Sequence, residues 1–195
     1  MSNIRSIFLK YTAKLLEYPA GRERGTALHR MMEQELKAAG ELALTCHRGC
    51  AGCCHYEVEI TEDEAVILSD AVQRGVAIDR ERLALQAARE RQSPEWGKFF
   101  SPDNRCVFLG PENTCAVYAD RPSICRKHLV VSPPAHCTTA GAEVAPIRVL
   151  LAEILLSASL SIEGNAFGSL AKMLVAALPP AEPAVNAVTV LAPAL

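Results

Sequence analysis

The chain has 195 residues, of which 50% are hydrophobic and 22% charged, so it contains enough apolar material for one compact domain. Lys and Arg number 20 against 22 Asp and Glu, the formal net charge is −2, and aromatic residues make up 5%. A chain with no excess of positive charge and few aromatic side chains is not expected to bind nucleic acid in general. The residue type in surplus is cysteine.

Neither an export signal nor a membrane span is expected from the sequence. The first 16 residues are interrupted by Arg5, Lys10 and Lys14, so they lack the unbroken apolar stretch of a signal peptide. The most hydrophobic segment, residues 147–162, contains an Arg and a Glu and is too short and too charged to cross a bilayer. We therefore expect a cytoplasmic protein, in a compartment where thiols stay reduced.

Helical periodicity dominates the chain, because apolar residues recur at spacings of three and four. The ranges expected to be helical are 3–18, 23–39, 61–75, 79–92, 145–160 and 167–178. Thr61 and Glu64 form a capping-box pattern, and Asp79 is placed to cap the next helix. Residues 56–60 alternate like a short strand, whereas residues 93–105 are rich in Pro, Gly and polar side chains and are expected to form a loop.

The segment between the two central helices and the C-terminal helices has little helical pattern. Residues 106–109 and 115–118 are expected to be short extended runs joined by a Gly-Pro turn, with Asp120 capping a helix of one or two turns. We predict a mainly α fold, a single helical domain with cysteine-bearing loops and at most a small β-ribbon. This metal-binding helical domain is expected to span residues 1–178, followed by a Pro-rich C-terminal tail at 179–195.

The eight cysteines are the candidate metal ligands. They are Cys46, Cys50, Cys53, Cys54, Cys106, Cys115, Cys125 and Cys137. Four of them lie within nine residues together with two glycines, and loop spacings of two or three residues let neighbouring sulfurs face a common centre. Adjacent side chains diverge, so we expect Cys53 and Cys54 to serve different roles. The other four complete a cysteine core over residues 46–137.

Eight sulfurs are compatible with several kinds of centre. Two four-thiolate zinc sites, one iron–sulfur cluster with spare cysteines, and a polynuclear site all fit the count. The other interpretations are buried cysteines acting as small hydrophobes and, in an exported protein, disulfides. His55 and His128 stand beside the motifs as alternative ligands. Arg121 and Arg126 either bind an anionic substrate or hydrogen-bond to thiolates and carbonyls, and we favour the second role.

Two stretches of the sequence carry a family resemblance. They read CHRGCAGCCH and CVFLGPENTCAVYADRPSICR. They resemble the YkgJ-type cysteine-cluster family, described as a zinc- or iron-chelating domain with a CxxCxxCC signature. In that pattern a vicinal cysteine pair precedes Cys-x-Phe-Leu, Cys-x-x-Tyr, Arg-Pro and Cys-Arg elements, all of which are present here. The sequence departs from the signature in that three residues, instead of two, separate Cys46 from Cys50.

The resemblance implies a protein that chelates zinc or iron, with an iron–sulfur cluster as one form of the centre and the metal ion as its partner. A related flagellin lysine methylase shares the cysteine signature, so the alternative function is an iron–sulfur redox or group-transfer enzyme. The sequence contains no GxGxxG fingerprint and no GxxxxGK[ST] loop, the motifs of nucleotide sites. It does not decide whether the protein is an enzyme, nor does it identify a protein partner.

Overall fold

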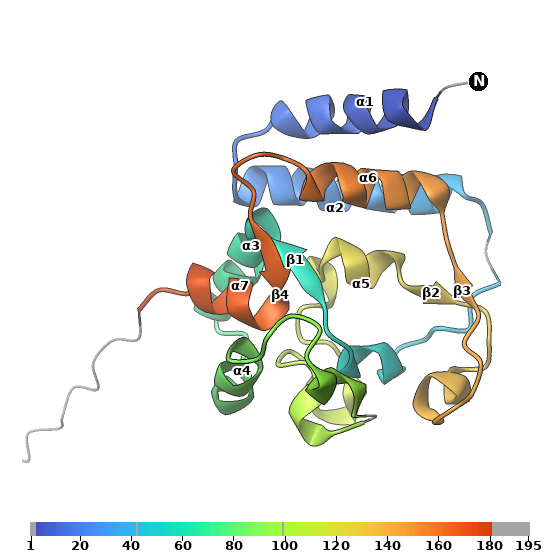
Figure 1. The fold of residues 1–195 in the computed structure, drawn as a ribbon, viewed down its shortest axis with the longest axis vertical. Coiled ribbons are helices and arrows are strands. Elements are labelled where there is room, and N and C mark those ends of the chain that lie inside the picture. The colour runs from blue at the N-terminus through green and yellow to red at the C-terminus, as the bar shows by residue number, and fades with distance from the viewer. Residues whose placement is uncertain (1–2, 42, 99, 181–195) are drawn as a thin grey trace, which may run out of the picture.

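The computed structural model describes residues 3–41, 43–98 and 100–180. Within these residues the chain forms seven α-helices and two small antiparallel sheets of two strands each (Figure 1). The predicted fold class, mainly α with little β-structure, is therefore confirmed. The predicted tail, 179–195, lies outside the described residues except for its first two positions.

Three helices form one side of the molecule: α1 (Ile4–Leu16), α2 (Arg22–Ala38) and α6 (Leu150–Leu160). Figure 1 shows α1 lying along α6 and α2. Their facing side chains form an apolar cluster of Leu15, Leu28, Met32, Ala152, Leu155, Leu156 and Ile162. Burial of these side chains joins the N-terminal helices to a late segment of the chain. In the described part of the chain, no helix combines the length and the apolar character needed to cross a membrane.

A second apolar cluster lies among the helices α3 (Glu62–Gln73), α4 (Arg80–Ala87) and α7 (Leu170–Ala177). Its buried members are Ile60, Ala65, Leu68, Ala71, Leu83, Val107, Phe108, Val117, Leu170, Ala171 and Leu174. Cys106 and Cys115 pack against this cluster. The cluster therefore anchors the chain segment that carries these two cysteines.

Two predicted helix caps are confirmed. The Thr61 hydroxyl accepts from the Glu64 N–H at 3.3 Å, and the Glu64 carboxylate accepts from the Thr61 N–H at 3.2 Å, which completes the capping box of α3. The Asp79 carboxylate accepts from the Arg82 N–H at 2.8 Å and caps α4. The α4 helix ends at Ala87 instead of near residue 92.

The predicted Asp120 cap is wrong. Helix α5 (Ser123–Lys127) follows Pro122, and no side chain caps its N-terminus. Asp120 belongs to a separate 3-10 turn and forms an ion pair with Arg74, whose Nη2 lies 3.0 Å from the carboxylate. A carboxylate near the start of a helix can accept from several donors. Here the Asp120 carboxylate pairs with Arg74, at the C-terminal end of α3, instead of with the backbone of α5.

The strands form two short ribbons: β1 (Glu59–Thr61) with β4 (Phe167–Ser169), and β2 (Leu129–Val130) with β3 (Pro146–Ile147). The later strand of each ribbon lies at the start of a range predicted to be helical, 145–160 or 167–178. Helices α6 and α7 therefore begin later than the periodicity predicts. Strand pairing depends on a partner distant in sequence, so helical periodicity does not reveal it.

Buried polar contacts join α2 to α3. Arg24 forms a two-nitrogen contact with Asp63, and both side chains are almost fully buried. The His29 ring nitrogen Nε2 lies 3.2 Å from Glu64 Oε1, and the same oxygen accepts from the Ser123 N–H at 2.7 Å. Glu64 therefore connects α3 to α2 and also to α5, the helix that carries one cysteine.

Candidate metal centre

The first cysteine loop is held where it leaves α2. The Thr45 N–H donates to the Val130 carbonyl at 3.1 Å, which fixes the loop against β2. The Cys50 N–H donates to the His47 carbonyl at 3.0 Å and closes a tight turn. Gly49 within this turn has φ +85°, a left-handed conformation that glycine adopts without steric cost.

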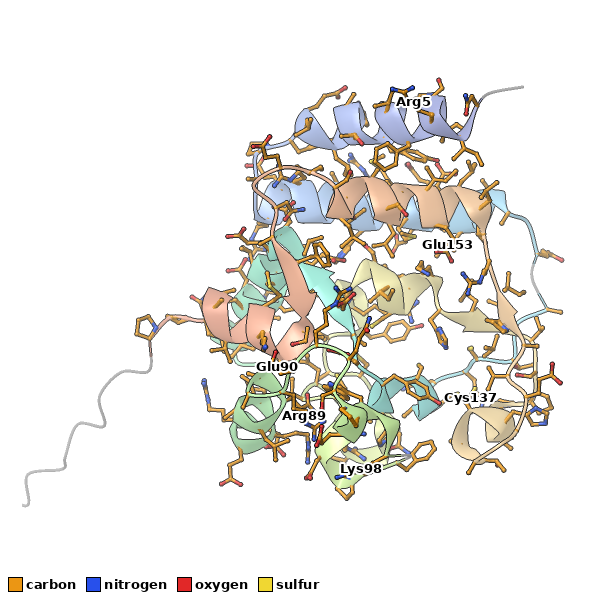
Figure 2. All side chains as sticks on the ribbon, viewed as in Figure 1. Arg5, Arg89, Glu90, Lys98, Cys137 and Glu153 are labelled. Atoms are coloured by element: carbon orange, nitrogen blue, oxygen red, sulfur yellow. The ribbon has the colours of Figure 1, made fainter. Side chains whose placement is uncertain are left out.

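Gly52 begins the 3-10 helix Gly52–His55 and lies directly against Cys137, in the 3-10 helix Pro134–Thr138. A Cβ atom added to Gly52 would stand 2.6 Å from Cys137 Cβ and 2.7 Å from the Cys137 carbonyl oxygen. In Figure 2, Cys137 lies on the other side of helices α2 and α6 from Arg5 of α1. Because glycine has no Cβ, Gly52 allows two cysteine-bearing segments that are distant in sequence to pack directly against each other.

The second cysteine segment is attached to the first by its backbone. The Cys106 N–H donates to the Cys54 carbonyl at 2.8 Å. Two residues later, Phe108 is almost fully buried and its carbonyl accepts from the Ala116 N–H at 2.9 Å. This pairing turns residues 106–116 into a small hairpin with Cys106 and Cys115 on opposite arms. The expected pair of extended runs is thus reduced to one isolated bridge, between positions 109 and 115.

Four cysteines from three segments share one region of the structure; we call Cys53, Cys106, Cys115 and Cys125 the inner group. Burial, together with smaller contributions from the neighbouring thiols of Cys115 and Cys53, raises the pKa of Cys106 to about 11. Burial also raises the pKa of Cys125 well above its usual value, with added contributions from Cys106, Cys53 and Cys115. Interactions of this kind weaken with distance, so the two loops and α5 place these thiols near enough for their charges to interact.

A second set, the outer group, contains Cys46, Cys50 and Cys137. Burial is the main cause of the raised pKa of Cys137, and the thiols of Cys50, Cys46 and Cys53 add to it. Cys53 thus interacts with both groups. The pKa of Cys53 is itself strongly raised, first by a hydrogen bond with Cys54 and then by burial.

All eight cysteines are free thiols. Among the described residues, no three His, Cys, Asp or Glu side chains stand in a ready-made arrangement for a metal ion. The chemistry of the donor set nevertheless fits a thiophilic ion. Buried thiols become soft anionic ligands when they lose their protons, and a divalent cation offsets the charge that burial penalises.

A cavity of about 240 Å³ adjoins both groups of cysteines. Its lining comprises Cys53, Tyr56, His128, Cys137, Val144 and Pro146. Of the two alternative ligands, His128 faces this cavity. His55 instead places its ring nitrogen Nδ1 3.1 Å from the Ala51 carbonyl and its ring against Phe100, with centroids 4.7 Å apart.

Most of the basic side chains near the cysteines are engaged elsewhere. Arg126 donates through Nε to the Arg121 carbonyl at 2.8 Å, and its other nitrogens contact Glu33 and the Ala119 carbonyl. Lys127 forms an ion pair with Glu153 at 2.9 Å. Arg126 therefore hydrogen-bonds to protein carbonyls and a carboxylate, which agrees with the structural role that the sequence favours over binding of an anionic substrate.

Some residues of the site have no signal in the sequence. Val144 and Pro146 line the cavity because β3 pairs with β2. The sequence around these two residues does not predict that pairing. Gly52 has a weak signal, since glycine among cysteines suggests close backbone approach. Its particular partner, Cys137, is visible only in the folded chain.

Fold and site together define the class of this molecule: a mainly α-helical protein whose cysteine-bearing loops converge. Residues 45–139 match the model of the CxxCxxCC family, described as a "Putative zinc- or iron-chelating domain". The family resemblance predicted from the cysteine motifs is thereby confirmed over this segment. No significant match to the chain was found among curated proteins or among solved structures.

Proposed function

We propose that this protein binds zinc or iron through cysteine thiolates, as a metal-handling or metal-sensing protein. The observation that carries the proposal is the convergence of free thiols from three separate segments, with Cys53 interacting with both groups. Thiols that served only as small hydrophobes would have no reason to collect around one side chain. The family match over residues 45–139 supports the same chemistry.

We assign the ligands by group. The inner group supplies four thiols, the number that closes a tetrahedral zinc site or binds a four-cysteine iron–sulfur cluster. The outer group supplies three, and either Cys54 or His128 is suited to complete it. With Cys54 as the fourth ligand of the outer group, all eight cysteines belong to the proposed ligand set, and each group draws on more than one chain segment.

The setting of the protein follows from the same chemistry. Eight free thiols suit a reducing compartment, so we propose a cytoplasmic location. We treat residues 1–178 as one domain, because the cysteine segments pack against helices from both ends of the described chain. With a net charge of −2, general nucleic-acid binding is not expected.

The second candidate function is an iron–sulfur redox or group-transfer enzyme. The cavity bounded by Cys53, Cys137 and His128 favours it, because a purely structural metal site is closed and leaves no room for a ligand. An iron–sulfur cluster would supply electron transfer or an open iron at this position. The walls of Tyr56, Val144 and Pro146 would keep the space partly apolar.

Anaerobic purification followed by elemental analysis and a visible spectrum tests the proposal. Zinc gives a colourless protein and an iron–sulfur cluster a coloured one. Cys125→Ser and Cys46→Ser each remove a ligand from a different group, so each should lower the metal content per chain. His47→Gln is the matched control, because His47 is exposed in the same loop and its ring nitrogen Nδ1 lies 2.8 Å from the neighbouring carbonyl oxygen of Arg48. Wild-type protein that retains neither metal contradicts the proposal.

A further inference from the structure

Arg121 is a cation to which the fold assigns no carboxylate. It lies between the 3-10 helix Tyr118–Asp120 and α5, and it takes part in no ion pair among the described residues. Its guanidinium carbon lies 4.3 Å from the centre of the Tyr118 ring. Its Nε atom is buried and has no hydrogen-bond partner. A buried donor without an acceptor is costly and uncommon in native proteins.

The neighbouring Arg126 makes the contrast clear. Each of its guanidinium nitrogens contacts an acceptor, either the Glu33 carboxylate or a backbone carbonyl. One of those carbonyls belongs to Arg121 itself, so Arg126 fixes the backbone from which the Arg121 side chain projects. The sequence treats the two arginines alike, but the structure gives only Arg126 a complete set of protein partners.

Arg121 stands between two segments of the inner group, because the 3-10 helix before it follows Cys115 and helix α5 after it contains Cys125. A hydrogen bond with Cys54 and burial raise the pKa of Cys53, and burial raises the pKa of Cys115. The positive charge of Arg121 opposes both increases, because it favours the thiolate form of each side chain. These two cysteines come from different loops, so Arg121 lies where the segments of the inner group meet.

We infer that Arg121 is a positioning residue of the cysteine centre, whose Nε–H donates to a ligand sulfur and whose charge offsets part of the thiolate charge. The inference rests on the proposed function. Four thiolates around a divalent ion leave a net charge of about −2, and a guanidinium held beside them reduces the repulsion. Contact with the Tyr118 ring holds the guanidinium plane in place.

Zinc affinity, measured by competition with a chromophoric chelator, tests this role. Arg121→Leu removes the charge and leaves no N–H at the ε position, and partners of metal ligands typically change affinity by about 10- to 100-fold, so we expect a loss in that range. Arg121→Lys keeps the charge without a nitrogen at the Nε position and should lie between the two. The matched control is Arg74→Gln, which removes a nearby exposed charge that is paired with Asp120.

Cobalt(II) bound in place of zinc gives a readout that a merely structural role would not move. A hydrogen bond to sulfur stabilises its lone pairs, so the sulfur-to-cobalt charge-transfer band should shift to longer wavelength in both Arg121 variants and not in Arg74→Gln. Equal zinc affinity in wild type and Arg121→Leu, or an equal loss in Arg74→Gln, overturns the inference. If Arg121→Leu does not fold by circular dichroism, Arg121→Lys decides, and wild-type affinity with an unmoved band overturns it. Wild-type protein that binds neither zinc nor iron refutes the proposed function itself, which separates the two failures.

Discussion

Replacement of Gly52 by alanine is the sharpest test of the contact between the first cysteine loop and Cys137. The added Cβ would stand 2.6 Å from Cys137 Cβ and 2.7 Å from its carbonyl oxygen, whereas ordinary contacts begin at 3.4 Å. One of the two 3-10 helices must therefore move by about 0.8 Å. The obstructing atoms are Cys137 Cβ and the Cys137 backbone. Rotation of a flexible side chain therefore cannot relieve the overlap.

Overpacking of this kind costs about 1–3 kcal/mol. In a domain of this size each kcal/mol lowers the melting temperature by about 2–4 °C, so we expect a fall of roughly 2–12 °C. The effect on metal binding should be larger in proportion. Ligand distances tolerate changes of about 0.2 Å, and the required shift separates Cys50 and Cys53 from Cys137 by several times that amount.

Differential scanning calorimetry of the metal-free protein and chelator competition of the loaded protein measure the two effects. Gly97→Ala is the control, because a Cβ at Gly97 meets nothing within 4 Å. We expect the control to match wild type in both assays. A Gly52→Ala protein with unchanged melting temperature and unchanged metal affinity would refute the reasoning, since the loop would then not need this close approach.

Three further predictions concern the helical framework and the metal. Arg24→Ala should cost about 3–5 kcal/mol of unfolding free energy, because it leaves the buried Asp63 charge unpaired; urea unfolding checks this, and a cost below about 1 kcal/mol contradicts it. Burial alone would raise the pKa of Glu64, but hydrogen bonding and charge from His29, with backbone N–H donors, hold the pKa below its ordinary value of 4.5. The ionised Glu64 carboxylate therefore adds to the free energy of unfolding above that pH, and this contribution is lost as the pH falls. Glu64→Gln should destabilise the metal-free protein at pH 7 and differ less from wild type in unfolding free energy below about pH 4. A difference in unfolding free energy that stays constant across the pH titration would contradict this role of Glu64. Metal removal by a chelator should lower the melting temperature of wild type, since metal at 1,000 times its Kd stabilises a fold by about 4 kcal/mol; coincident melting curves before and after removal would be the contrary result.

Local signals in the sequence predicted local structure well. The capping box of Thr61 and Glu64 and the cap by Asp79 involve residues three apart, so a short stretch contains all the information that they need. Asp120 has the same chemistry as Asp79, yet it pairs with Arg74 from another helix. The difference between the two aspartates lies in a neighbour that is distant in sequence.

By itself the sequence determined the fold class, most of the helices, and the family resemblance of the cysteine segment, because helical periodicity and cysteine spacing are properties of consecutive residues. Only the tertiary structure decided which thiols interact. It placed Cys137 with Cys46 and Cys50, although in sequence Cys137 follows Cys125 of the inner group. Within the described residues it also left Arg121 without a carboxylate, whereas the nitrogens of Arg126 all have acceptors. Such groupings come from packing and hydrogen bonds between distant segments, and those contacts exist only once the chain has folded.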